Sequence, residues 1–292
     1  MALTTKIAWC DATANFWIGC TKISPACDHC YAEADWATRR GRVQWGPHGV
    51  RDFVKAGAGV IRRIQKGAAE FLREHGRPPI VFINSLSDFA DNHASIDPAW
   101  RTAVWDSIRA APDVVFVILT KRPQNLVRYL PADWGRGWPN VILGTTAENQ
   151  DEADRRLPHL IAIPAAMRMV SAEPLLGHIN LSQWLAKIDW LIVGGESGKR
   201  ARAPHPNWVR SLLSQCNRTG TPFLFKQWGE WTPTINGSRC IAQDGRNMPN
   251  LEPHGRNGNG TARIERLGKD KAGRTLDGVE YHAFPSFTKA AK

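Results

Sequence analysis

Six short apolar runs between residues 78 and 227 constrain the fold of this 292-residue chain more than any other feature. Runs such as VVFVILT and WLIVGG are apolar throughout, which is typical of strands buried on both faces. Helical patterns separate several of the runs, and strands that alternate with helices predict a parallel sheet with right-handed crossovers. The runs cover residues 80–84, 114–120, 141–145, 167–171, 190–194 and 222–225.

Capping residues and apolar periodicity predict helices among and after these strands. Asp97 and Pro98 form a favourable N-cap and first-turn pair, and Pro206 opens a later helix. The apolar residues that share one helix face are Trp100, Val104 and Ile108 in the first helix, and Trp208, Leu212 and Cys216 in the second.

Short polar sequences follow the predicted strands, at the point where each strand ends. In a parallel barrel these strand ends open on one face, where active sites lie, so the polar clusters should converge on one pocket. We therefore predict an α/β protein with a parallel, partial TIM-type β/α barrel. An open doubly wound sheet is the rival architecture, which periodicity does not exclude. The polar sequences are Ser85-Leu86-Ser87-Asp88, Lys121-Arg122, Thr146-Ala147-Glu148-Asn149, Ala172-Glu173-Pro174 and Gly195-Glu196-Ser197.

The composition changes after Trp228, where Gly, Asn, Arg and Lys dominate, as in HGRNGNGTARIERLGKDKAGR. No long apolar run follows. We therefore divide the chain into a barrel over residues 1–228, with an N-terminal cysteine loop, and a basic, loop-rich C-terminal extension over residues 229–292. The extension could contact nucleic acid, although a solvated basic tail is the commoner explanation of such a run.

Charge and hydropathy limit the partners and the compartment. Lys and Arg total 38 against 27 acidic residues, and a net charge of +11 would attract a polyanion such as nucleic acid. Many soluble proteins, however, are basic for no specific reason. No apolar run approaches the ~18–20 residues that cross a bilayer, and the first residues lack a signal-peptide core. We expect a cytoplasmic protein without a membrane partner, in which close-set cysteines indicate a metal or catalysis.

The segment GCTKISPACDHCYAE places Cys20, Cys27 and Cys30 in a C-x6-C-x2-C pattern. A C-x2-C pair lets two thiolates face one metal or cluster from a tight turn, and the third arrives from the preceding loop. Three thiolates are one short of the four that a closed iron–sulfur or structural zinc site prefers. The open coordination position would then bind a substrate or a cofactor.

The spacing alone is compatible with an iron–sulfur cluster and with structural zinc. A zinc ion would take a further ligand from Cys10, His29 or Cys240. Cys216 lies on the apolar face of a predicted helix and is expected to be a packed core thiol. Cys10 and Cys240 carry no motif.

A cysteine loop near the N-terminus, followed by a series of β/α units, resembles the radical-SAM superfamily. More closely, WCDATANFWIGCTKISPACDHCYAE, NSLSD, ILTKRP, GTTAENQ, SAEPLLG, VGGESG and FKQWGEW resemble the phage-associated three-cysteine-motif family of radical-SAM-like proteins. The resemblance spans roughly residues 8–230 and continues in GKDKAGRTLDG. The spacing of the cysteines departs from C-x3-C-x2-C, the commonest pattern of the superfamily.

The resemblance implies that the three cysteines hold three irons of a [4Fe-4S] cluster, while the fourth iron binds the amino and carboxylate groups of S-adenosylmethionine. One electron, supplied through the cluster by an electron donor, cleaves the sulfonium. The resulting 5′-deoxyadenosyl radical abstracts a hydrogen from the substrate. The protein supplies position, exclusion of water and a charge environment.

The resemblance also gives roles to the residues that follow the strands. One group would bind the methionine amino group, and a second would meet the ribose hydroxyls. Glu173 and Glu196 are candidates for contact with cofactor or substrate. The first group is Asn84, Ser85, Ser87 and Asp88, and the second is Thr146, Glu148 and Asn149.

Basic residues line the predicted barrel mouth. Lys121 and Arg122 could hold the methionine carboxylate or a substrate phosphate, because Arg grips either through two parallel hydrogen bonds. Lys199 and Arg200 are expected to contact a substrate phosphate, and Arg202 also lines the mouth. The alternative interpretation of LTKRP is the start of a helix whose charged side chains are exposed to solvent.

The resemblance implies relatives that act on nucleobases or are found near nucleic-acid genes. Together with the basic mouth, this favours a base in DNA, or a nucleotide, over a small acidic metabolite. Frequent occurrence of the family in phages implies DNA hypermodification, for instance a radical rearrangement of an amino-acid adduct on a thymidine methyl group.

Three alternatives stay open at this point. A repair lyase resembling spore photoproduct lyase would need a cysteine, Cys216 or Cys240, to return a hydrogen atom to the product. A tRNA-modifying radical enzyme differs only in the nucleic acid. The third is a zinc-stabilised nucleic-acid-binding protein without catalysis.

Overall fold

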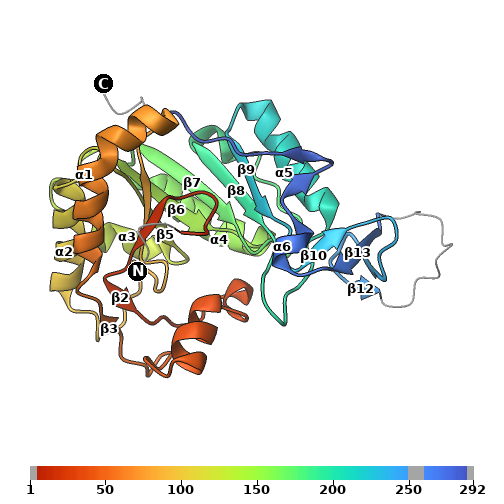
Figure 1. Cartoon of the computed structure of the whole chain (residues 1–292), viewed down its shortest axis with the longest axis horizontal. Helices are drawn as coiled ribbons and strands as arrows, with labels where there is room; N and C mark the ends of the chain where they lie inside the picture. The colour runs from red at the N-terminus through yellow and green to blue at the C-terminus, as the bar shows by residue number, and fades with distance from the viewer. Residues whose placement is uncertain (1–4, 249–259, 288–292) are drawn as a thin grey trace.

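Seven parallel strands form a curled sheet, half of a barrel, in the computed structural model, which describes residues 5–248 and 260–287 (Figure 1). The prediction of an α/β chain built on a parallel sheet is confirmed, and the curvature is consistent with a partial barrel. A doubly wound sheet reverses its strand order at a switch point, whereas this order follows the chain throughout. It runs β1 (Ala12–Ala14), β4 (Ile80–Ile83), β5 (Val115–Thr120), β6 (Val141–Thr146), β7 (Met167–Ala172), β8 (Trp190–Gly194) and β9 (Phe223–Gln227).

The six strands expected from the apolar runs all form, with ends that shift by at most two residues. The sequence analysis missed β1, whose three residues, ATA, are too few to show a periodicity. β1 pairs with β4 in parallel, with Ala12 opposite Val81. It therefore begins the sheet and leads directly into the cysteine segment.

The main helices pack on the convex face of the sheet. Alternate strand residues such as Val81, Phe116 and Leu191 join helix residues in one large core, because successive side chains of a strand point to opposite faces. The Asp97 side chain accepts a hydrogen bond from Ala99 N at 2.8 Å, as the predicted N-cap requires. The helices are α1 (Gly57–His75), α2 (Pro98–Arg109), α3 (Pro123–Leu126), α4 (Gln150–Ala162) and α5 (Pro206–Thr219). Short 3-10 helices form at η1 (Pro25–Cys27), η3 (Val127–Tyr129) and η4 (Leu185–Lys187), and η2 (Glu33–Arg39) is a π-helix.

A second apolar cluster fills part of the concave face, where Trp9 and Cys10 pack against strand residues such as Trp190. Phe284 and Phe287, from the end of the chain, pack against the same cluster. The C-terminal segment therefore returns to the barrel.

This return is made by backbone hydrogen bonds to the last strand. Phe225 N donates to Tyr281 O at 2.9 Å, and Ala283 N donates to Phe223 O at 3.2 Å. His282 Nε2 then lies 3.0 Å from Ala8 O, so the segment links β9 to the N-terminal residues.

The remaining strands of the C-terminal region form a small antiparallel sheet to one side of the barrel (Figure 1). Its order is β10 (Trp231–Pro233), β13 (Ala262–Arg266), β11 (Arg239–Ile241) and β12 (Asn247–Met248). Residues 249–259, which carry much of the Gly- and Asn-rich stretch, lie outside the described residues. The division into two domains stays a prediction. The other short elements are β2 (Trp17–Ile18), β3 (Asp52–Phe53), α6 (Lys269–Ala272), β14 (Thr275–Leu276) and β15 (Val279–Glu280).

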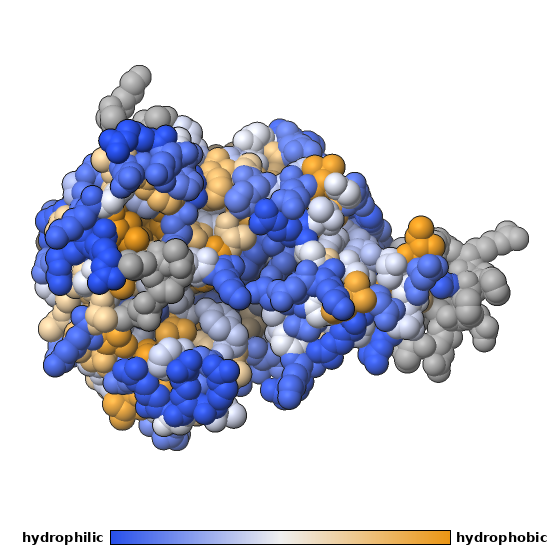
Figure 2. All heavy atoms as spheres, in the orientation of Figure 1, coloured by the Kyte–Doolittle hydropathy of each residue, from blue (hydrophilic) through white to orange (hydrophobic). Residues whose placement is uncertain are grey.

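The surface is mostly hydrophilic on the face shown in Figure 2, with apolar side chains in several separate places. Among the described residues, no helix has the length and apolar character needed to cross a membrane.

Candidate functional site at the carboxyl ends of the strands

The cysteine loop, defined as residues 19–31, contacts the groups that follow several strands of the sheet. Gly19 forms a parallel bridge with Ser87, beyond the end of β4. The Tyr31 hydroxyl donates to Ser85 O at 2.8 Å, and Ala26 N donates to a Glu148 carboxylate oxygen at 3.2 Å. The polar sequences at several strand ends therefore contact one common segment, the cysteine loop.

The three cysteines of this loop differ from the others in accessibility. Cys20, Cys27 and Cys30 are free and half-buried, whereas the remaining three are free and buried. Cys216 packs in the core on the convex side of the sheet, as expected, and Cys240 lies in the small sheet. Neither belongs to the cluster on the concave face, so the contacts do not favour either as a hydrogen donor inside the barrel.

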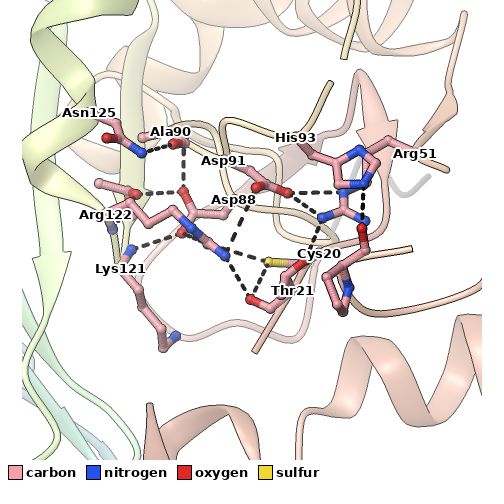
Figure 3. A network of polar contacts seen from close by, with 12 residues as sticks. Cys20, Thr21, Arg51, Asp88, Ala90, Asp91, His93, Lys121, Arg122 and Asn125 are labelled. Carbon is pink, nitrogen blue, oxygen red and sulfur yellow. Dashed lines mark hydrogen bonds and ion pairs between the residues drawn. The ribbon is translucent and has the colours of Figure 1, made fainter. Parts of the chain in front are cut away.

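Arg122 connects the Cys20 thiol to the end of β4 (Figure 3). Its Nη1 lies 3.7 Å from Cys20 Sγ and 3.0 Å from Asp88 Oδ2, and its Nη2 donates to Thr21 O at 2.7 Å. Arg122 is only 6% exposed. A buried guanidinium therefore fixes the position of the first cysteine.

Asp88 is held on all sides by donors of the protein. It accepts hydrogen bonds from the Thr120 hydroxyl, from Lys121 N at 3.0 Å and from Ala90 N at 2.9 Å, besides the bond from Arg122. These contacts make Asp88 the residue that orients Arg122. Its role in binding the methionine amino group stays a prediction.

Burial controls the ionisation of the thiols. It raises the pKa of Cys20 to about 12, with a further rise from Asp88 and a partial reduction from Arg122. Burial likewise raises the pKa of Cys30. Thiolates are the form that binds metals, so metal binding here would have to release these protons.

Arg51 and Asp91 form a buried ion pair that holds the same loop through Thr21. The sequence analysis missed both residues. The fully buried Arg51 side chain donates to Asp91 Oδ2 at 2.7 and 2.9 Å and to Thr21 Oγ1 at 2.7 Å (Figure 3). The neighbouring Gly19 has a φ of +109°, and a Cβ there would lie 3.1 Å from Arg51 Cδ. No motif marks this pair, because its two members lie 40 residues apart in the chain.

Two of the other predicted residues leave buried polar atoms without partners. Asn84 accepts a hydrogen bond from Phe16 N through Oδ1 at 2.9 Å, and its φ is +58°. Asn84 Nδ2 and Ser87 Oγ are buried and have no hydrogen-bond partner in the described part of the chain. Ser85, between them, bonds Asn15 at 3.2 Å. Unsatisfied buried polar groups are rare in proteins, so this strand end is a candidate ligand site.

Glu148 is fully buried and links α4 to the cysteine loop. Its carboxylate accepts from Arg156 Nη1 at 2.7 Å on one side and from Ala26 N on the other. Burial acts to raise the pKa of Glu148, but Arg156 and smaller contributions from Ser24 and Lys121 outweigh it, so the pKa is lowered. Glu148 is therefore ionised and holds the loop.

Thr146 and Asn149, the other residues predicted to meet a ribose, also have structural partners. The Thr146 hydroxyl accepts from Arg156 Nη1 at 2.9 Å, and Asn149 Oδ1 caps α4 by accepting from Glu152 N at 3.0 Å. Contact of these residues with a ribose stays a prediction.

Glu196, beyond the end of β8, anchors the middle of the loop through Arg202. Arg202 donates to Glu196 at 2.6 and 2.9 Å, to Pro25 O at 2.8 Å and to Asp28 at 3.1 Å. His29 Nδ1 lies 3.1 Å from Glu196 Oε2. Burial acts to raise the pKa of Glu196, but the hydrogen bonds from Arg202 and His29 lower it overall.

Glu173 belongs to an ion pair with Lys226, a residue of β9 that the sequence analysis did not select. Their charged atoms lie 2.8 Å apart. Gly194 makes room for the carboxylate, since a Cβ there would lie 2.5 Å from Glu173 Oε1. Burial is the main cause that raises the pKa of the concave-face thiol Cys10, and Lys226 and Glu173 have smaller, opposing effects on it. The motif FKQWGEW contains Lys226 and was the sequence signal that could have identified this residue.

Lys199 and Arg200 lie in the exposed loop after β8. The backbone oxygen of Lys199 accepts from Arg266 Nη2 at 2.8 Å, which ties this loop to β13 of the small sheet. Within the described ranges, neither side chain has a hydrogen bond or an ion pair, so both cations remain available to an anionic partner.

A zinc ion and a [4Fe-4S] cluster require different spacings between the thiolates that bind them. A zinc ion with bonds of about 2.3 Å brings its sulfur ligands within about 4 Å of each other. No three His, Cys, Asp or Glu side chains in residues 5–248 and 260–287 are grouped to hold one metal ion. A [4Fe-4S] cluster separates its thiolates more widely, because each binds a different iron. The three half-buried thiols, with a guanidinium on one of them and unsatisfied polar atoms nearby, are the groups that would hold such a cluster.

Comparison with known proteins gives a family. The family model described as "Protein of unknown function (DUF5131)" matches residues 4–285. No curated protein and no solved structure matched the chain. Because the family model covers nearly the whole sequence, the chain belongs to the DUF5131 family of proteins of unknown function.

Proposed function

We propose that the protein is a radical S-adenosylmethionine enzyme whose [4Fe-4S] cluster is bound by Cys20, Cys27 and Cys30. The observation that carries the proposal is the convergence of strand-end groups on the cysteine loop. Arg122 and Glu196 hold it from different strands, together with Ser85 and Glu148. We include in the proposal that the half barrel is a partial TIM-type barrel, with its site at the carboxyl ends of the strands.

When bound, the cluster and S-adenosylmethionine would supply a 5′-deoxyadenosyl radical. The chain's own residues position these groups. Arg122 keeps a positive charge at Cys20 Sγ, and hydrogen bonds to cluster sulfurs are one means by which proteins set a reduction potential. The Glu173–Lys226 pair supplies polar contacts on the concave side, and Asn84 and Ser87 offer free polar atoms at the end of β4.

We propose a nucleobase in DNA as the substrate, and a rearrangement of an adduct on a thymidine methyl group as the reaction. The charge of +11 supports a polyanionic substrate, since phosphate neutralisation dominates nucleic-acid affinity. The Lys199 and Arg200 side chains, which have no ion pair with any described residue, support it as well. The particular base and reaction rest on the family resemblance.

Metal analysis of anaerobically purified protein tests the cofactor. We expect a brown protein with about four irons per chain, as a [4Fe-4S] cluster requires. Cys20→Ala, Cys27→Ala and Cys30→Ala should each lose the colour, whereas Cys240→Ala, in the small sheet, should keep it. A colourless protein with one zinc, which also fails to take up iron on anaerobic reconstitution, would replace the radical mechanism with a zinc-stabilised binding protein.

Mass analysis of nucleosides tests the substrate separately. Modified phage DNA is incubated with the iron-loaded protein, a reductant and S-adenosylmethionine, and a rearranged nucleoside is expected. If S-adenosylmethionine is cleaved but every nucleoside stays unchanged, the radical chemistry stands and the DNA substrate is wrong; modified tRNA is then the next substrate to test.

A further inference from the structure

A pocket of about 370 Å³ lies between the cysteine loop, the start of α3 and helix α4. Four basic residues line it, and no acidic side chain is among its lining residues. Amide side chains add further hydrogen-bond donors. The residues that matter for its chemistry are Lys121, Arg122, Arg155, His159, Asn92 and Gln124.

The charges of the pocket do not cancel. Arg122 is balanced by Asp88, and Arg155 forms an ion pair with Glu152. The Lys121 ammonium has no hydrogen bond or ion pair in the described part of the chain, and Figure 3 shows its side chain extending away from the Asp88–Arg122 pair. Lys121 therefore leaves the pocket with an excess positive charge.

We infer that this pocket binds a phosphate group of a nucleotide or of a polynucleotide. A phosphate offers several acceptor oxygens to the ammonium, guanidinium and amide donors that line the walls. A volume of about 370 Å³ falls in the range of small-ligand sites and accommodates more than a bare ion. The assignment of this phosphate to the enzyme's substrate rests on the proposed function. The pocket and its positive charge are independent of that function.

Binding measurements on the full-length protein test this inference without any radical chemistry. The probes are inorganic phosphate, a deoxynucleoside 5′-monophosphate and a single-stranded oligodeoxynucleotide without terminal phosphates. Lys121→Gln removes the unpaired cation of the pocket, and His159→Gln removes its imidazole. His159 is exposed, so its replacement should leave the fold intact. Lys187→Gln removes an exposed lysine in η4, outside the pocket, and serves as the matched control.

Each pocket variant should weaken binding by about tenfold, because charge-assisted hydrogen bonds contribute enough for such a change. The control should bind as the unmodified protein does. Weakened binding of phosphate and the monophosphate identifies a terminal phosphate as the ligand. Weakened binding of the oligonucleotide alone identifies a phosphodiester of a strand.

The inference is overturned if none of the probes binds, or if the pocket variants and the control bind them equally well. Iron content and cleavage of S-adenosylmethionine are measured on the same preparations. An iron-loaded, active protein that binds no phosphate defeats only this inference. Specific phosphate binding by a protein that takes up no iron defeats only the proposed function.

Discussion

At the scale of single residues, the site depends on charged side chains that hold the cysteine loop in place. Arg122 touches Cys20 Sγ, and Asp88 in turn orients Arg122. Arg51 fixes the neighbouring Thr21 through a hydrogen bond of 2.7 Å. None of these side chains could be replaced by an apolar one without leaving a buried partner unpaired, which is costly.

Arg122→Gln should make the reduction potential of the bound cluster more negative, because it removes a positive charge from Cys20 Sγ. The expected shift is on the order of 50 mV, from the loss of a charge-assisted hydrogen bond in a one-electron couple. Potentiometric titration followed by electron paramagnetic resonance measures it. Arg128→Gln, an exposed change in η3, is the control. An iron-loaded Arg122→Gln protein with an unaltered potential would contradict the role given to Arg122.

At the scale of elements, helix α4 and the loop after β8 connect the convex layer to the cysteine loop. Asn149 starts α4, and Arg156, two turns later, pairs with the buried Glu148 that bonds Ala26. On the other side, Arg202 joins Glu196 to the loop. The cysteine loop is therefore held on one side by helix α4 and on the other by the loop after β8.

Asn149→Ala should lower the free energy of unfolding by about 1 kcal/mol, the usual cost of losing an N-cap. Asn149→Asp should keep this stability, because a carboxylate caps equally well. Urea denaturation measures the stability of both variants. Asp97→Ala removes the N-cap of α2 and serves as the matched control. If Asn149→Asp keeps stability but weakens S-adenosylmethionine binding while Asp97→Ala does not, the amide also serves the predicted ribose contact. Full stability of Asn149→Ala would show that the cap contributes nothing.

Arg202→Met should lower the free energy of unfolding at neutral pH by about 1–2 kcal/mol, since it leaves Glu196 buried while Arg202 itself is partly exposed. The pKa of Glu196 lies below its ordinary value of 4.5 in the folded protein. The stabilisation by this pair is therefore present above that value and is lost as pH falls through the lower, folded pKa.

Denaturation at a series of pH values tests this dependence. The difference in stability between the unmodified protein and Arg202→Met should be constant near neutrality and should shrink below about pH 4. Arg218→Met changes an exposed arginine at the end of α5 and should show no such difference. If the difference in stability between the unmodified protein and Arg202→Met stays the same in strong acid, Arg202 acts through packing and not through Glu196.

At the scale of the whole molecule, a described segment near the C-terminus contacts both the last strand of the sheet and the residues before the first strand. His282 lies against Ala8, and Phe284 packs against the concave-face cluster. The Phe284 ring lies 5.3 Å from that of Trp190, and Arg77 lies 4.5 Å from its centroid. The last residues therefore belong structurally to the barrel.

Phe284→Ala should lower the free energy of unfolding by about 2 kcal/mol, less than for a fully buried ring because Phe284 is only half-buried. Urea denaturation followed by tryptophan fluorescence detects both the loss of stability and the change around Trp190. Val279→Ala, at a half-exposed position of β15, should cost little. Equal stability of the two variants would show that the C-terminal segment does not support the barrel.

The sequence by itself determined the six principal strands, their parallel direction and the three-cysteine motif, because apolar runs, strand–helix alternation and cysteine spacing are local patterns. The order of the strands in the sheet, which decides between a partial barrel and a doubly wound sheet, came from the tertiary structure. The tertiary structure alone decided how the strand ends hold the cysteine loop. His29 and Glu196 lie 167 residues apart, and Arg51 and Asp91 carry no motif. Such ion pairs depend on the curvature that brings distant strand ends together. The return of the C-terminal segment to β9 likewise depends on backbone hydrogen bonds, which no pattern of side chains in a loop-rich sequence reveals.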